Sequence, residues 1–143
     1  MLVKNGSQYK ERVAQINDTA LILAKWFESR PEIENVYYPG CGETKSCFDA
    51  CKRDTPESGY GCLLSIIPRE DVDHKRFFDA LNVHKGPSLG TDYTLVCPYT
   101  LLAHYNELDW AATYGVDSRV IRISVGLGRF KMFYDLLLLH TWI

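Results

Sequence analysis

The spacing of apolar and polar positions predicts several helices along the chain. Residues 7–30 carry apolar side chains at steps of three and four, from Tyr9 to Phe27, which places them on one face of a long helix. The same spacing predicts helices over residues 70–81 and 99–114, and a short helix around residues 46–53 lies within a predicted loop. The three longer segments are therefore expected to pack an apolar face against a common core.

The strand predictions come from β-branched and aromatic runs that end at proline or glycine. Such runs cover residues 33–38, 62–67, 91–98 and 119–125. In the last run two sets of side chains alternate with a period of two, as they do on the two faces of a strand. The resulting order of helices and strands predicts a single α+β domain, of the α/β class in the broad sense, in which a mostly antiparallel sheet carries helices on one face.

Length, composition and charge exclude several classes of protein. The 143 residues are 46% hydrophobic and 24% charged, which is typical of a folded domain of 16.4 kDa. A net charge of −2 offers no basic excess for nucleic-acid binding, and no apolar run is long enough to span a membrane. The odd number of five cysteines and the polar start of the chain favour free thiols in a reducing, cytoplasmic compartment.

Common catalytic and metal-binding motifs are missing from the sequence. Four of the cysteines fall between residues 41 and 62, but their spacing lacks the two close pairs of a structural zinc site, so no metal site is predicted. The four histidines are scattered, and no nucleophile elbow is present. Residues 85–91 contain glycines and a lysine without matching a phosphate-binding loop, and a tight turn is the simpler interpretation.

Arg122 is the residue whose chemistry stands out from its surroundings. It lies between Ile121 and Ile123 in an otherwise apolar predicted strand. A guanidinium is always charged and presents a planar fork of N–H donors that suits a bidentate carboxylate. Strand alternation also permits an ordinary arginine on the solvent face of the sheet, so the spacing leaves both interpretations open.

Several motifs in chain order resemble one enzyme family. They are Ser88-Leu89-Gly90, the helix segment 101–110, residues 114–116, and the strand from Val120 through Arg122 to Gly126, with residues 36–40 and 59–65 upstream. Over residues 2–127 the chain resembles the C-terminal domain of the Cys/Met-metabolism family of pyridoxal-phosphate (PLP) enzymes, and within it the fungal cystathionine γ-synthase type.

The resemblance implies a domain organisation and a reaction. Residues 1–127 would form the small C-terminal domain of a fold-type I PLP enzyme, and residues 128–143 an apolar tail unlike the family. The implied function is transsulfuration in methionine biosynthesis, in which cysteine replaces the γ-substituent of an O-acyl-homoserine. PLP would be bound by the family's large domain, which is absent from these residues, so the isolated chain is expected to be inactive and not to bind the cofactor alone.

The resemblance also implies roles for individual residues. Arg122, with Ser88, would bind the substrate carboxylate, and Leu89 and Tyr93 would lie near cofactor and substrate. Many family members have glutamate where this chain has Tyr93, which leaves the choice of substrate open. No catalytic residue is expected here, because the Schiff-base lysine belongs to the missing domain.

The implied partners are an amino-acid substrate and homologous subunits, since the family forms homotetramers. Two alternatives remain. The chain could be a non-catalytic module that pairs with full-length subunits, or part of a related PLP enzyme of secondary metabolism that catalyses γ-elimination or forms carbon–carbon bonds.

Overall fold

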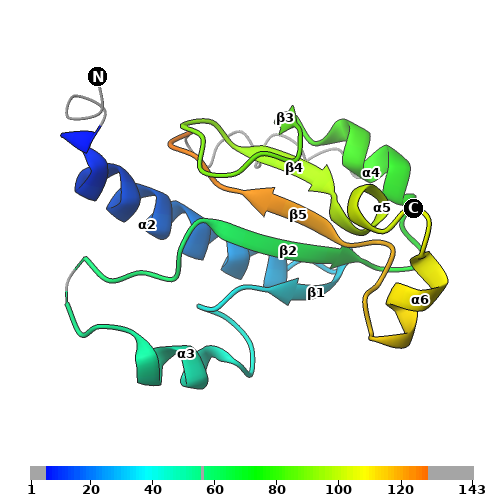
Figure 1. Ribbon diagram of the computed structural model, residues 1–143, viewed down its shortest axis with the longest axis horizontal. Helices are drawn as coiled ribbons and strands as arrows, with labels where there is room; N and C mark the ends of the chain where they lie inside the picture. Colours follow the sequence, from blue (N-terminus) through cyan, green and yellow to red (C-terminus); the bar gives the residue numbers. More distant parts are fainter. Residues whose placement is uncertain (1–5, 56, 129–143) are drawn as a thin grey trace.

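The computed structural model describes residues 6–55 and 57–128 as a five-stranded sheet with helices packed against it (Figure 1). The helices are α2 (Tyr9–Glu28), α3 (Lys45–Cys51), α4 (His74–Ala80), α5 (Tyr99–Ala103) and α6 (Leu108–Thr113). The strands are β1 (Ile33–Tyr37), β2 (Leu63–Pro68), β3 (His84–Lys85), β4 (Leu95–Pro98) and β5 (Ile121–Ser124). Among the helices of these residues, none is long and apolar enough to cross a membrane.

The sheet is mixed, with strand order β1-β2-β5-β4-β3. The pairings β1–β2, β2–β5 and β4–β5 are antiparallel, and the short strand β3 pairs with β4 in parallel. The predicted α+β class and the mostly antiparallel sheet are confirmed. Strand β5 lies at the centre of the sheet, so its side chains are placed by neighbours on both sides.

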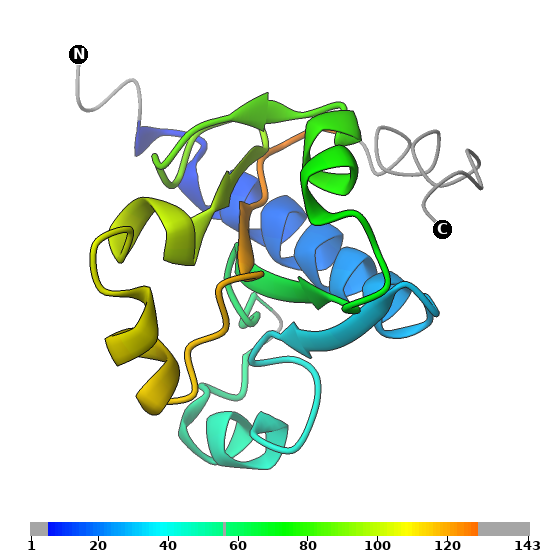
Figure 2. The same ribbon diagram turned by 90° about the vertical axis from the view of Figure 1, so that its right-hand side faces the viewer.

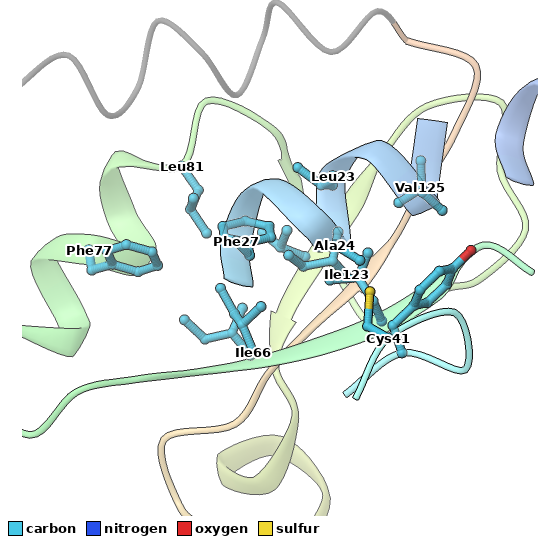
Figure 3. Close-up of a cluster of buried hydrophobic side chains, with 14 of the residues drawn as sticks. Leu23, Ala24, Phe27, Cys41, Ile66, Phe77, Leu81, Ile123 and Val125 are labelled. Atoms are coloured by element: carbon cyan, nitrogen blue, oxygen red, sulfur yellow. The ribbon is translucent and has the colours of Figure 1, made fainter. Parts of the chain in front are cut away.

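One face of the sheet carries the hydrophobic core. Leu64 of β2, Ile123 of β5 and Val96 of β4 are aligned across the sheet and point to this face, where they are almost fully buried. Helix α2 packs Leu23 and Phe27 against them, and α4 closes the same core with a set of apolar side chains that Figure 3 shows beside Phe27. The apolar stripe of the long helix thus faces the sheet, as its spacing predicted.

The opposite face of the sheet presents a different row of side chains. Ser65 of β2, Arg122 of β5 and Cys97 of β4 are register partners, one residue away from the buried row on each strand. Because successive side chains of a strand point to opposite faces, these three side chains lie on the face away from α2. The central strand therefore places Arg122 in the middle of this second face.

The chain departs from the sequence-based expectations in four places. The helix expected over residues 99–114 is two short helices, because a turn at residues 104–107 is closed by the bond from Glu107 N to His104 O (2.9 Å) and by His104 Nδ1 with Glu107 Oε1 (2.7 Å). The strand expected from residue 91 begins only at Leu95, and β3 was not predicted at all. Helix α4 starts at His74 because the side chain of Asp73 caps it, accepting a hydrogen bond from Arg76 N.

Candidate functional site

Contacts with Pro87 and Tyr99 hold the Arg122 side chain in place on the second face of the sheet. Its Nη2 donates to the carbonyl oxygen of Pro87 (2.5 Å), and its Cζ lies 5.0 Å from the centre of the Tyr99 ring. The side chain is partly buried. Within the described residues no carboxylate lies within ion-pair distance of this guanidinium. Arg122 is thus a positioned cation whose charge is not neutralised.

Arg119 shows what a structural arginine in the same segment looks like. Its guanidinium donates to both carboxylate oxygens of Asp117 and to Glu34 Oε2 (2.8 Å), and also to the Pro68 carbonyl (3.0 Å). The hydrogen bonds from Arg119 lower the pKa of Asp117 below its usual value. Arg119 therefore joins the start of β5 to β1 and β2. Its Nε, Nη1 and Nη2 all donate to groups of the fold, so no pair of N–H donors remains for a ligand. The contrast marks Arg122 as the residue of the pair that can bind an anion.

The loop of residues 86–93, between β3 and β4, lies beside the end of β5 (Figure 1). Three hydrogen bonds fasten it there: Gly90 N to Ser124 Oγ (3.2 Å), Leu127 N to Asp92 O (2.8 Å) and Arg12 Nη1 to Asp92 Oδ1 (3.1 Å). The loop therefore has a fixed position relative to Arg122.

Gly126 allows this close approach. A Cβ at this position would lie 2.4 Å from the Tyr93 carbonyl carbon and 2.7 Å from Asp92 O, so only glycine fits against that backbone. The Gly126 amide also donates to Thr94 Oγ1 (3.1 Å), which is buried. Residues 92 and 93 form a bend against Gly126, and β4 begins only after it, at Leu95.

The other predicted site residues belong to this loop. Ser88 and Leu89 follow Pro87 directly, and Leu89 is 52% exposed on the same segment that Arg122 contacts. Tyr93 is 50% exposed and packs edge-on against the His84 ring, with 4.7 Å between the ring centres. The structure thus brings Arg122 next to the segment that carries Ser88 and Leu89, while Tyr93 lies at the far end of the loop.

Cys97 lies directly beside Arg122 on the neighbouring strand. It is 1% exposed, and its burial raises the pKa of the thiol, an effect that the nearby Arg122 charge partly offsets. A neutral thiol leaves the guanidinium charge intact. Cys97 is therefore a buried side chain that contacts Arg122 through its sulfur.

Helix α3, which carries Cys47 and Cys51, lies apart from the strand β5 that carries Arg122 (Figure 2). Cys41, Cys47 and Cys51 line an open cleft of about 940 Å³ between β1 and α3. Within the described residues no group of three metal-ligating side chains could hold an ion. All five cysteines are free thiols.

Tyr99 is the part of the site that the sequence did not reveal. Helical spacing assigned it to a helix, and nothing in the pattern indicated that its ring would lie against Arg122. Pro98 was the one local signal for the position of Tyr99. It ends β4 and caps the start of α5, and β4 is the strand next to β5, so the first residue of α5 lies close to Arg122.

Comparison with known proteins gives this geometry a family context. The family described as Cys/Met metabolism PLP-dependent enzyme matches residues 7–136. Cystathionine gamma-synthase of Neurospora crassa is 41% identical over 124 residues, which cover 87% of this chain and 20% of the relative. The cystathionine gamma-synthase of Saccharomyces cerevisiae is 39% identical, over 88% of this chain and 20% of its own. The chain thus spans about a fifth of the length of these curated relatives.

Solved structures share the fold. A cystathionine gamma-lyase from Lactobacillus plantarum, complexed with L-serine, superposes with a TM-score of 0.77 at 20% identity, covering 91% of this chain and 34% of that one. A cystathionine gamma synthase from Xanthomonas oryzae, in complex with cystathionine, gives a TM-score of 0.75 at 19% identity, covering 92% of this chain and 34% of that one. The fold is therefore that of a part of the fold-type I PLP enzymes.

Proposed function

Because the chain belongs to the Cys/Met metabolism PLP-dependent enzyme family, we propose that it forms the substrate-carboxylate-binding part of a cystathionine gamma-synthase-like enzyme. The reaction proposed for the whole enzyme replaces the γ-substituent of an O-acyl-homoserine with the sulfur of cysteine. One observation carries the proposal: Arg122 is a positioned, partly buried guanidinium without a carboxylate partner among the described residues. An α-carboxylate is the anion that such a planar fork binds well.

The proposed role of the chain is to bind and orient the substrate. A guanidinium has five N–H donors; Pro87 O takes one and Cys97 also contacts the group, so donors remain from which a carboxylate would accept. The loop of Ser88 and Leu89 would line the same side and keep the bound amino acid away from bulk water. Fixing the carboxylate at one end determines where the γ-carbon at the other end lies, which is the contribution of orientation to the rate.

The family's cofactor PLP supplies an electron sink for carbanions next to the amino group. Its site requires a lysine for covalent attachment and a charged partner for the ring nitrogen. The described residues do not fit that requirement. Among the described residues the lysine nearest Arg122 in sequence is Lys85, whose ammonium donates to the Leu81 carbonyl and lies 5.0 Å from the Phe78 ring centre. Lys45 is paired with Asp49. The cofactor is therefore assigned to residues beyond those described here, and no step through it is derived for this chain.

A hybrid enzyme tests the proposed function. Joining this chain to the preceding part of the Neurospora crassa relative, in place of that enzyme's own matching segment, should give an enzyme that forms cystathionine from O-acetyl-L-homoserine and cysteine. Product analysis separates the reaction classes, because γ-elimination would yield 2-oxobutyrate and ammonia instead. A hybrid that folds and binds PLP but makes only the elimination products would refute the proposed replacement reaction.

A second experiment tests the proposed inactivity of the chain by itself. We expect that PLP and borohydride label no lysine of the 143-residue chain stoichiometrically. Peptide mapping by mass spectrometry reads out the result. Full labelling of one lysine would contradict the assignment of the cofactor to other residues.

The proposed partners and compartment follow from the same family. We propose homologous subunits as partners, and co-purification with a full-length relative tests this. The five free thiols support the proposed cytoplasmic location.

A further inference from the structure

The Tyr99 ring holds Arg122 without using any of its hydrogen-bond donors. The guanidinium carbon lies 5.0 Å from the ring centre, within the range of a cation–π interaction. Where a ring lies over the face of a guanidinium, the N–H donors along the edge of the guanidinium stay available for hydrogen bonds to a carboxylate. A ring can therefore fix the plane of the Arg122 guanidinium and leave its N–H donors free. A carboxylate side chain of the fold would instead occupy those donors.

The position of Tyr99 is itself fixed by the backbone. It follows Pro98, which is the register partner of Ile121, and its amide donates to Val120 O (3.0 Å). The next residue, Thr100, is fully buried and donates from Oγ1 to Asp117 O (2.7 Å). The ring thus starts from a rigid junction between β4 and α5, on the strand beside Arg122.

We propose that Tyr99 is a positioning residue for carboxylate binding: its ring and the Pro87 carbonyl together set the plane of the Arg122 guanidinium. The inference rests on the proposed function, because it assumes that Arg122 binds a carboxylate. It goes further by assigning a role to a residue that the motifs of the family resemblance did not include. The same contacts hold a partly buried cation that has no ion-pair partner among the described residues.

The test uses the full ¹⁵N-labelled chain and follows the Arg122 Nε–Hε signal by NMR. The signal is assigned with Arg122→Lys, and the chain is titrated with O-acetyl-L-homoserine and with its methyl ester, which lacks the carboxylate. Wild type and Tyr99→Phe should bind the acid more tightly than the ester. Tyr99→Leu should weaken acid binding about two- to fivefold, the size of a partly exposed cation–π contact, and leave the ester unchanged.

A fluorinated ring separates electrostatic positioning from packing. Replacing Tyr99 with 3,4,5-trifluorophenylalanine keeps the shape of the ring and removes its negative face, so it should weaken acid binding as Tyr99→Leu does. Tyr105→Leu is the matched control, because Tyr105 is a 74% exposed tyrosine on the next turn and should have no effect. This series stays informative even if Tyr99→Leu fails to fold.

The outcomes distinguish the two claims. A wild-type chain that does not prefer the acid over the ester would overturn the proposed carboxylate site, and this inference with it. Acid binding as tight as wild type in both the Tyr99→Leu and the fluorinated variants would overturn the role of Tyr99 alone.

Discussion

Gly126→Ala is expected to destabilise the fold at the point where the candidate site is fastened. The new Cβ would lie 2.4 Å from the Tyr93 carbonyl carbon and 2.7 Å from both Asp92 O and Tyr93 Cα. All three atoms are backbone, so the loop of residues 86–93 must move away. Overpacking of this kind costs about 1–3 kcal/mol, and loss of the buried bond from Gly126 N to Thr94 Oγ1 adds about 1 kcal/mol. The free energy of unfolding should therefore fall by about 3 kcal/mol.

Urea unfolding of the 143-residue chain, followed by far-UV circular dichroism, measures this change. With an m-value of about 2 kcal/mol per molar urea, the midpoint should fall by about 1.5 M. Gly128→Ala is the matched control two residues away, because nothing lies within 4 Å of its Cβ position. Equal midpoints for the two alanine variants would refute the argument that Gly126 is required for close contact with the loop.

Three further predictions concern the ion pair, the core and the thiols. Arg119→Met should lower the free energy of unfolding by about 2 kcal/mol, because it leaves the partly buried Asp117 carboxylate without the charge of its arginine partner. Since the pKa of Asp117 is lower in the folded chain than in the unfolded chain, the pair stabilises the fold above about pH 4, and Asp117→Asn should reduce the loss of stability seen below that pH. Phe27→Ala should cost about 4 kcal/mol, because its ring is fully buried. Native-state alkylation at pH 8 should label the exposed Cys47 before Cys41, whose thiol pKa burial raises to about 11.

Each of these predictions has a control on the same chain. Arg69→Met removes an exposed ion pair with Asp71 and should change the free energy of unfolding by less than about 1 kcal/mol. Ile22→Ala, the control for Phe27→Ala, removes a side chain of α2 that is 54% exposed and should likewise have a small effect. Chemical denaturation reads out the variants, and mass spectrometry reads out the thiols. A cost for Arg69→Met equal to that of Arg119→Met, or simultaneous labelling of Cys41 and Cys47, would contradict the burial on which the predictions depend.

The helices and strands with a regular apolar spacing were predictable, because burial of one face in the core requires that spacing. Helix α2 and strand β5 lie where the apolar spacing placed them, since each presents one face to a single core. The break at residues 104–107 was not predictable in this way, because the backbone and side-chain contacts between His104 and Glu107 that form the turn leave no apolar pattern. The two-residue strand β3 exists only through its parallel pairing with β4, which leaves no local pattern.

The candidate site divides in the same manner. Alternation placed Arg122 on one face of β5, and the resemblance supplied its expected role together with those of Ser88, Leu89 and Tyr93. The spacing could not say which arginine has an ion-pair partner. Arg119, three residues earlier, is neutralised in part by Glu34, whose strand lies 85 positions away in sequence. Such a contact appears only once the sheet is assembled, and of these two arginines it leaves Arg122 without a carboxylate partner among the described residues.

The measurement that tests the central claim most directly is the steady-state kinetics of Arg122→Lys in the hybrid enzyme. Lysine keeps the charge but loses the planar fork, so kcat/KM for O-acetyl-L-homoserine should fall about tenfold or more. Arg69→Lys, an exposed arginine away from the sheet face, should leave it unchanged. Unchanged kcat/KM for Arg122→Lys would contradict the claim that this chain provides the carboxylate-binding arginine of its enzyme.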